Sequence, residues 1–313
     1  MNIVLLDGDT LGKDISLQPI EQFGTLKVYG ITPAHEIKSR IEKAEIVIVN
    51  KVNLGRNEID LAPNLKLICV AATGTNNVDL EYASEKNIPV KNVSGYSTDS
   101  VAQTTFASLL NLRCHISYYD QYVKSCAYTT SPIFTHFTQE YNEIADKQFG
   151  IIGLGTIGKK VAQIATAFGA RVVYCSSTKK NKKNEYLRME LGELLKTSDI
   201  VSIHCSLNDS TKNLITEKEL KTMKPSALLL NLSRGGIVNE KDIVKALDEK
   251  WIAGAAFDVY EQEPMPPNHP FYRIKDKSKF ILTPHLAWAS TEARKKLVDG
   301  IAKNIETFIN CGK

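Results

Sequence analysis

The chain has 313 residues, enough for two domains of roughly 150 residues each. Hydrophobic residues make up 43% of it and charged residues 24%, with 18 Gly and 11 Pro, a composition that excludes collagen-like, disordered and low-complexity proteins. The 39 basic and 35 acidic side chains leave a net charge of only +4, which does not favour nucleic acid or an anionic membrane as a partner.

The N-terminal run from Met1 to Asp7 lacks a preceding basic segment, so we interpret it as a buried strand rather than a signal peptide. No stretch of about 18 uninterrupted apolar residues occurs. The cysteines are far apart, form no C-x-x-C pair and have no histidine at metal-ligand spacing. We therefore expect reduced thiols, no metal site and a cytoplasmic location. The six cysteines are Cys69, Cys114, Cys126, Cys175, Cys205 and Cys311.

Two series of short apolar runs alternate with longer amphipathic stretches, a pattern that predicts two α/β units with parallel sheets. The first series comprises Ile3 to Leu6, Lys27 to Ile31, Ile46 to Val49, Leu65 to Ala71 and Val90 to Val93. The second comprises Phe149 to Ile152, Arg171 to Cys175, Ile200 to His204, Ala227 to Leu232, Gly254 to Val259 and Phe280 to Thr283.

Three helices stand out around these runs. The segment from Pro33 to Lys43 places Ile37 and Ile41 on one face of a packing helix. From Ser97 to about Tyr122 there is no Gly or Pro, which predicts one long N-capped helix. The segment from Thr291 to Ile309 has the apolar spacing of a further helix, which could close the second unit or return to the first.

The sequence F-G-I-I-G-L-G-T-I-G, from Phe149 to Gly158, predicts a dinucleotide-binding turn. Gly153, Gly155 and Gly158 follow an apolar strand and open an amphipathic helix, and Thr156 and Ile157 lie between them. The first two glycines allow a tight turn and close approach to a pyrophosphate, and the third lets helix and strand pack. The helix N-terminus adds N–H groups and a positive dipole end.

The end of the next strand bears on the choice of cofactor. NAD-binding turns usually have an acidic residue about 20 positions on, which binds the ribose 2′-hydroxyl. Here the strand ends in Ser176, Ser177 and Thr178, followed by Lys179 and Lys180, which offer hydroxyls and positive charge to a 2′-phosphate. We therefore expect NADP(H) to be used at least as well as NAD(H), unless this loop is merely exposed.

Polar residues follow three strands of the second series, where open α/β sheets place their ligands. They are Arg234 in S-R-G-G, Glu263 in D-V-Y-E-Q-E-P, and His285 in T-P-H-L-A-W. Each also has a plain structural interpretation: Arg234 could cap a loop, Glu263 could be a solvated carboxylate, and His285 could be a core histidine. Glu261 is the nearest rival of Glu263.

With these motifs in this order, the chain resembles the D-2-hydroxyacid dehydrogenase family over essentially its whole length. The resemblance implies that Arg234, Glu263 and His285 are catalytic. The chemistry agrees, because reduction of a 2-oxo acid needs a cation for the carboxylate, a hydride donor, and a proton donor for the developing alkoxide. A guanidinium can hold carboxylate and carbonyl oxygens together, and histidine exchanges protons near neutral pH. A carboxylate on the other ring nitrogen would favour the imidazolium.

The resemblance implies further assignments. Asp258 would contact the nicotinamide carboxamide, and the turn containing Thr73 and Gly74 would offer N–H groups to the substrate carboxylate. A Rossmann-type nucleotide domain, residues 98–286, would be inserted into a flavodoxin-like substrate domain, residues 1–97 and 287–313, with the site in the cleft between them. The long helix from Ser97 would lie in the interface of a homodimer.

Within the family, the segments around Asn50, Thr73, Tyr96 and His285 look most like glycerate dehydrogenases, also called hydroxypyruvate reductases. We therefore expect hydroxypyruvate or glyoxylate as the oxo acid and D-glycerate or glycolate as the product. Asn50 and Lys51 could contact substrate, or could simply end a strand at the surface. Pyruvate/D-lactate and 3-phosphoglycerate are alternative substrates, and a nucleotide-sensing corepressor on the same fold is the alternative function.

Overall fold

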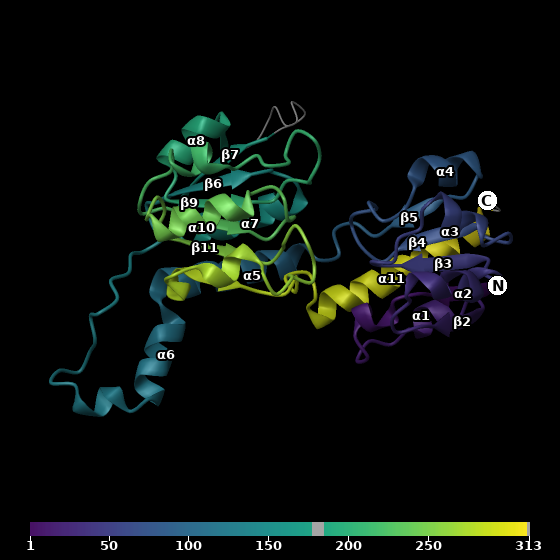
Figure 1. Cartoon of the computed structure of the whole chain (residues 1–313), viewed down its shortest axis with the longest axis horizontal. Coiled ribbons are helices and arrows are strands. Elements are labelled where there is room, and N and C mark those ends of the chain that lie inside the picture. Colours follow the sequence, from purple (N-terminus) through teal and green to yellow (C-terminus); the bar gives the residue numbers. More distant parts are fainter. Residues whose placement is uncertain (177–184, 312–313) are drawn as a thin grey trace. The chain divides into compact units, whose positions relative to one another are not determined.

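The computed structural model describes residues 1–176 and 185–311 (Figure 1). The chain forms two compact units, one made of Met1–Ser97 with Ala289–Lys313 and the other of Thr98–Trp288. The chain therefore leaves the first unit at the expected residue and returns to it two residues after the expected residue 287. Both units are parallel α/β structures, which confirms the predicted fold class.

The first unit contains a five-stranded parallel sheet in the order β2-β1-β3-β4-β5 within the described part of the chain, the order of flavodoxin-like folds. Its strands are β1 (Asn2–Leu5), β2 (Thr25–Val28), β3 (Ile46–Val49), β4 (Leu67–Val70) and β5 (Val90–Asn92). Its helices are α1 (Gln18–Glu21), α2 (Ile37–Ile41), α3 (Arg56–Asp60), α4 (Leu80–Glu85) and α11 (Thr291–Asn310), with the 3₁₀ turns η1 (Gly8–Leu11) and η2 (Ala34–Glu36).

Helix α11 belongs to the core of the first unit, which settles the open question of where the last helix goes. Its apolar face, Leu297, Ile301 and Ile305, is fully buried, and the helix packs on β4 and β5. Gly300 lies directly against Val93, just past β5, because a Cβ there would come within 2.5 Å of a Val93 methyl group. The first unit is therefore built from both ends of the chain.

The second unit contains a seven-stranded parallel sheet, counted over the described residues, in the order β12-β11-β10-β9-β6-β7-β8. The strands are β6 (Gln148–Ile152), β7 (Arg171–Cys175), β8 (Leu187–Arg188), β9 (Ile200–Ile203), β10 (Leu228–Asn231), β11 (Gly254–Phe257) and β12 (Phe280–Leu282). The strand order reverses between β6 and β9, as in a Rossmann fold, and ligands bind at such a switch point.

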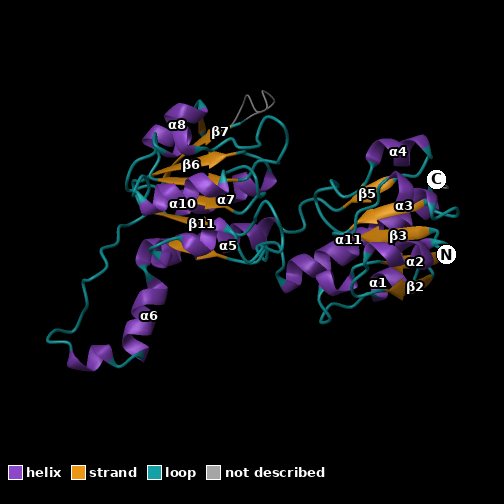
Figure 2. Cartoon of the chain, in the orientation of Figure 1, coloured by secondary structure: helices purple, strands orange, loops and turns teal. Residues whose placement is uncertain are grey.

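Helices cover both faces of this second sheet (Figure 2). Helices α5 and α7 pack on one face, and α8, α9 and α10 pack on the other. Their bounds are α5 (Thr98–Cys114), α6 (Ile116–Lys124), α7 (Thr156–Ala167), α8 (Leu191–Thr197), α9 (Glu217–Leu220) and α10 (Glu240–Asp248), with η3 (Ala127–Thr130), η4 (Pro270–Arg273) and η5 (Lys277–Lys279). Because both faces are covered, the strands are apolar without alternation, which is why their sequences were recognisable.

The single long helix expected from Ser97 to Tyr122 was wrong. Helix α5 ends at Cys114, His115 takes a left-handed backbone conformation with φ 51°, and α6 begins at Ile116. We call residues 115–143 the arm; α6 and the segment after it extend away from the sheet of the second unit (Figure 1). A single left-handed residue redirects the chain, and apolar periodicity does not reveal it.

Smaller differences concern short elements. The helix expected from Pro33 to Lys43 is divided into η2 and α2, and the two-residue strand β8 was not anticipated. Over residues 1–176 and 185–311, each helix is too short or too polar to cross a membrane.

Candidate active site

Three neighbouring strands of the second unit bring the three candidate catalytic residues to one edge of the sheet. Strand β11 pairs in parallel with β10 on one side and with β12 on the other. Arg234 follows β10, Glu263 follows β11, and His285 follows β12. Because the carboxyl ends of parallel strands meet at the same edge, residues 29 and 22 positions apart become neighbours.

His285 and Glu263 are in direct contact. Nδ1 of His285 lies 2.6 Å from Oε2 of Glu263. The other carboxylate oxygen, Oε1, accepts a hydrogen bond from the backbone N–H of Tyr260 at 3.0 Å. The two side chains are 24% and 27% exposed, so solvent and small molecules can reach the pair. Of the two acids considered, Glu263 rather than Glu261 faces the imidazole.

Asp258 holds the backbone segment that carries His285. Its side chain is buried, and Oδ1 accepts hydrogen bonds from the Thr283 hydroxyl at 2.6 Å and from the N–H of Leu286 at 2.9 Å. Oδ2 accepts from the N–H of Ala287 at 2.9 Å. Burial raises the pKa of this carboxyl above its ordinary value. The expected contact with a nicotinamide carboxamide stays a prediction, whereas the structure shows Asp258 bonded to its own chain.

Arg234 lies in a turn shaped by the residues before it. The buried Asn231 donates from Nδ2 to the Arg234 carbonyl at 2.9 Å and accepts at Oδ1 from the N–H of Ser233 at 3.2 Å. The half-buried guanidinium donates from Nη1 to the Ser233 carbonyl at 2.8 Å. The structure thus brings Arg234 to the same sheet edge as His285, with its turn fixed by the end of β10.

The Arg234 turn touches the Glu263 segment through Gly235. A Cβ at this glycine would lie 1.9 Å from the Tyr260 carbonyl oxygen and 2.5 Å from the Glu261 nitrogen. Only glycine allows this approach of two backbones. The turn that carries the guanidinium and the segment that carries the carboxylate are therefore packed against each other.

The glycine motif has the geometry of a dinucleotide turn. Gly153 follows β6 with φ 97°, a conformation that favours glycine, and a Cβ there would come within 2.6 Å of the Cys205 nitrogen. A Cβ at Gly158 would lie 2.2 Å from the Gly153 carbonyl oxygen, so this residue lets α7 pack on the turn. Among the described residues, by contrast, a Cβ at Gly155 would meet nothing within 4 Å.

The open space at Gly155 fits a bound phosphate. Gly155 caps α7, and Thr156, Ile157 and Gly158 form the first turn of this 12-residue helix. The N–H groups of a first turn have no partner within their own helix and point outward beside the positive end of its dipole. A pyrophosphate can therefore approach the backbone where any side chain at position 155 would stand.

Of the residues expected to select the cofactor, only Ser176 lies in the described part of the chain. Ser176 follows β7 and is half-buried, and its carbonyl accepts a hydrogen bond from Nη2 of Arg188 at 3.3 Å. Ser177, Thr178 and Lys179 lie outside the described residues. Arg188, on the edge strand β8, is a cation at this strand end that the sequence pattern alone does not mark.

In the first unit, the segment after β3 is held by a buried aspartate. Asp7 accepts hydrogen bonds from the N–H groups of Asn50 at 2.9 Å, Lys51 at 2.5 Å and Val52 at 3.0 Å. Asn50 is buried and donates from Nδ2 to the Thr10 hydroxyl at 2.9 Å, whereas Lys51 is exposed. Asn50 thus has a structural role, and contact with substrate is easier for Lys51.

Thr73 and Gly74 lie in the turn after β4. Thr73 is exposed, and its hydroxyl donates to the Val93 carbonyl at 3.3 Å. Its own carbonyl accepts from Nδ2 of Asn92 at 2.5 Å. Both bonds tie the turn to the end of β5, and the contact of this turn with a substrate carboxylate stays a prediction.

Three buried or half-buried residues near strand ends, His204, Cys205 and Cys69, are not activated groups. Burial lowers the pKa of His204 to about 4, and its ring bonds to the Ser202 hydroxyl at 2.8 Å, so it is neutral at neutral pH. Burial also raises the pKa of the Cys205 thiol to about 11 and that of Cys69 to about 12. Neither thiol is an activated nucleophile.

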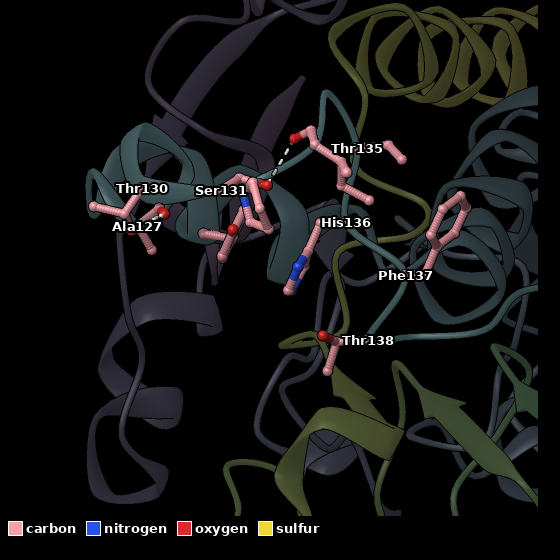
Figure 3. Close-up of a pocket in the computed structure, with 10 residues that line it drawn as sticks. Ala127, Thr130, Ser131, Thr135, His136, Phe137 and Thr138 are labelled. Atoms are coloured by element: carbon pink, nitrogen blue, oxygen red, sulfur yellow. Dashed lines mark hydrogen bonds between the residues drawn. The ribbon is translucent and has the colours of Figure 1, made fainter.

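A hollow of about 490 Å³ lies on the arm (Figure 3). Figure 3 shows Thr130, Ser131, Thr135 and His136 around it, and Tyr122 stacks on His136 with ring centroids 3.9 Å apart. Its lining includes none of the residues expected to bind cofactor or substrate. The hollow is therefore separate from the candidate site at the sheet edge.

Sequence reasoning missed the hydrogen-bonding roles of Asn231, Tyr260 and Asp258 in the second unit and that of Asp7 in the first unit. Asp7, Asn231 and Asp258 share one signal, a polar residue directly at the end of an apolar strand, which is costly to bury without a partner. This signal identifies such residues as bonded but does not name their partners.

Comparison with known proteins finds relatives that match nearly the whole chain. The description "D-isomer specific 2-hydroxyacid dehydrogenase, NAD binding domain" belongs to the family profile that matches residues 106–287. A hydroxypyruvate reductase of Blautia hydrogenotrophica is 36% identical, over 99% of this chain and 97% of the relative. A glycerate dehydrogenase of Methylorubrum extorquens is 35% identical, over 98% and 96%. The solved acyclic imino acid reductase Bsp5, in complex with NADPH and D-Arg, has a TM-score of 0.86 at 30% identity, over 99% and 98%.

Proposed function

Because the chain belongs to the D-isomer specific 2-hydroxyacid dehydrogenase family, whose members transfer a hydride between a nicotinamide cofactor and C2 of a small acid, we propose hydroxypyruvate as its main oxo substrate. Glyoxylate would be a second substrate, and D-glycerate and glycolate the products. The observation that carries the catalytic assignment is the 2.6 Å contact of His285 with Glu263 at the sheet edge that also holds Arg234.

His285 would supply the proton. With Glu263 ionised, Nδ1 of His285 donates to the carboxylate, so the proton that the imidazolium form would transfer to the substrate is the one on Nε2. Glu263 fixes the plane of the ring, and the N–H of Tyr260 holds the carboxylate in place. The pair thus presents an oriented acid to the oxygen that becomes the hydroxyl group.

Arg234 would bind the substrate. A guanidinium donates two parallel hydrogen bonds to a carboxylate and can polarise the adjacent carbonyl. Its turn is fixed by Asn231 and by the packing of Gly235 on the Tyr260–Glu261 peptide, so little ordering is needed when a substrate binds.

The turn at Gly153, Gly155 and Gly158, with the first turn of α7, would hold the dinucleotide, which supplies the hydride when bound. We propose NADPH as the preferred form. Support comes from Ser176 in place of an acidic residue, from Arg188 beside it, and from a similar structure that holds NADPH. If Arg188 binds the 2′-phosphate, R188A will raise KM for NADPH at least tenfold and leave KM for NADH within about twofold. Equal effects on both cofactors would contradict this choice.

On the substrate side we keep Lys51 and the turn of Thr73 and Gly74 as proposed contacts. Lys51 extends from a backbone fixed by Asp7, and the turn is tied to the end of β5. We propose Asn50 as a weaker substrate contact than Lys51, because the side-chain amide of Asn50 already donates to the Thr10 hydroxyl.

We further propose a cytoplasmic homodimer formed through the arm. Within the described residues α6 buries none of its side chains, and Phe134 and Phe137 are 89% and 77% exposed. Apolar surface of this kind marks a protein interface, and the family resemblance indicates a second copy. Light scattering should give twice the chain mass, and F134D/F137D should give a monomer. A wild-type monomer would overturn this assignment.

The test of the activity is an initial-rate panel with NADH and NADPH in parallel. The oxo acids are hydroxypyruvate, glyoxylate, pyruvate and 3-phosphohydroxypyruvate, and the expected order places hydroxypyruvate first. Preference for pyruvate or the phosphorylated acid would change the substrate assignment and leave the mechanism intact. Lack of turnover with every acid and both cofactors would favour the corepressor, although the relatives are named as reductases and dehydrogenases.

A further inference from the structure

A second histidine–glutamate pair, Glu240 and His269, contacts the loop that carries Glu263. Glu240, in the first turn of α10, and His269, just before η4, are 8% and 4% exposed. Nε2 of His269 lies 2.8 Å from Oε2 of Glu240. The rings of Tyr260, Phe271 and Tyr272 surround the imidazole. This pair is shielded from substrate and therefore does not take part in the reaction directly.

The hydrogen bonds of the pair define the direction of each proton. Nδ1 of His269 accepts from the N–H of Phe271 at 3.3 Å, so the ring proton sits on Nε2 and points to Glu240. The other oxygen of Glu240, Oε1, accepts from the N–H of Glu261 at 2.7 Å. His269 thus orients Glu240, and Glu240 holds the Tyr260–Glu261 peptide.

This peptide is shared by the catalytic segments. On one side it contacts Gly235, next to Arg234, with no room for a Cβ. Tyr260 donates its N–H to Glu263 and its hydroxyl to the Thr283 carbonyl at 2.7 Å, two residues before His285. A shift of this peptide would therefore change the positions of all three residues that the proposed function uses.

We propose that Glu240, oriented by His269, is a positioning residue that holds the Tyr260–Glu261 peptide and, through it, the contact of Glu263 with His285. The catalytic meaning of this assignment rests on the proposed function. A buried polar pair of this kind contributes little net stability compared with apolar residues of similar size, so a role in positioning explains its presence better than stability does.

Two double variants differ only in the acceptor offered to the Glu261 N–H. E240Q/H269F keeps an amide oxygen facing this N–H and replaces the imidazole by a ring of similar shape. E240L/H269F removes the acceptor and leaves an apolar pair. Both variants lose the buried charge, so comparison of the two isolates the hydrogen bond to the peptide.

The readout is the NMR resonance of the His285 Nδ1–H proton, which needs no turnover. In E240L/H269F the Glu263 carboxylate is no longer held on Nδ1, so we expect this resonance to move upfield or to be lost by exchange with water. In E240Q/H269F we expect the wild-type resonance. Asp258, which also holds the His285 segment, is unchanged in both. Equal Nδ1–H resonances in the two variants would overturn the proposal.

Kinetics separates this proposal from the proposed function. E240L/H269F should lose about tenfold or more in kcat relative to E240Q/H269F, with KM for NADPH and NADH unchanged in both. A loss of activity that follows only the unfolding temperature would show a structural role and count against positioning. If H285A turned over normally, the proposed function would fail, while the Nδ1–H resonance of His285 in the two double variants would still decide whether Glu240 holds Glu263.

Discussion

His285 and Glu263 form one short hydrogen bond across the ends of two adjacent parallel strands, with 2.6 Å between Nδ1 and Oε2. Their separation along the chain is 22 residues, and each is held by a neighbour, Glu263 by the N–H of Tyr260 and the His285 segment by Asp258. The imidazole and the carboxylate that contacts it are therefore already held in place in the absence of a ligand.

Removal of the imidazole tests the proton donor. We expect H285A to lower kcat for hydroxypyruvate by ~10²–10⁴-fold, because proton transfer to the developing alkoxide is lost. The affinity for the dinucleotide, measured by fluorescence titration, should stay within a factor of about two. H35A, at a histidine whose side chain is 80% exposed, serves as control. Near-wild-type turnover in H285A would refute the assignment.

Exchange of the guanidinium for an ammonium tests substrate binding. R234K keeps the charge but loses the fork that can hold two oxygens, so we expect kcat/KM to fall by about 10–100-fold, the cost of one charge-assisted hydrogen bond. R234Q should fall further. R171K, at the start of β7, changes the same residue type at an exposed position and should have no effect. If R234K behaved like R171K, Arg234 would not be the carboxylate ligand.

The glycine turn allows a contrast between folding and binding. G155A should fold normally, since φ is −80° and a Cβ meets nothing within 4 Å among the described residues, but the methyl group should weaken dinucleotide binding about tenfold or more. G158A should lower the free energy of unfolding by about 1–3 kcal/mol, because its Cβ would lie 2.2 Å from the Gly153 carbonyl oxygen. Thermal unfolding and NADPH titration measure the two effects. Unaltered affinity in G155A would place the phosphates elsewhere.

His204 predicts acid sensitivity of the second unit. Its pKa is about 4 in the folded protein, against an ordinary value of 6.5 that applies to the unfolded chain, so below pH 6.5 the unfolded state binds a proton that the native state does not. The group therefore removes stability as pH falls from 6.5 towards 4, by about 2 kcal/mol at pH 5.

The test is H204Q, which can still accept from Ser202. The loss of unfolding free energy between about pH 7.5 and pH 5 should be smaller than in wild type by about this amount. Tryptophan fluorescence in urea reports the second unit, because both tryptophans, Trp251 and Trp288, lie in it. H35Q should change nothing. Parallel pH profiles of H204Q and wild type would contradict the lowered pKa.

Much of the fold could be predicted because buried parallel strands have continuous apolar sequences between turn residues. The glycine turn could be predicted because its spacing carries its own backbone requirement, and Gly153 has the positive φ that this requires. The candidate catalytic residues could be placed at strand ends, and parallel pairing then brings them to one edge.

The rest depends on tertiary partners that periodicity does not encode. The left-handed residue His115 divides one predicted helix into two, although no Gly or Pro marks the position. Glu240 and His269 meet across 29 residues, and the sequence shows only a histidine and an acid far apart. Asp258 accepts from three donors that follow β12, and its own sequence motif does not show these partners. The nicotinamide contact that the family resemblance implies for Asp258 stays a prediction.

The hydroxyl of Ser100 donates to the Ala287 carbonyl at 2.6 Å, so the first and last residues of the second unit lie side by side. A domain whose two ends lie side by side can be inserted into another domain, or removed from it, without distorting that domain. This arrangement is what an origin of the chain by domain insertion requires. This hydrogen bond makes residues 98–288 suitable for separate expression. The remaining segments, Met1–Ser97 and Ala289–Lys313, would need only a short artificial linker to be rejoined.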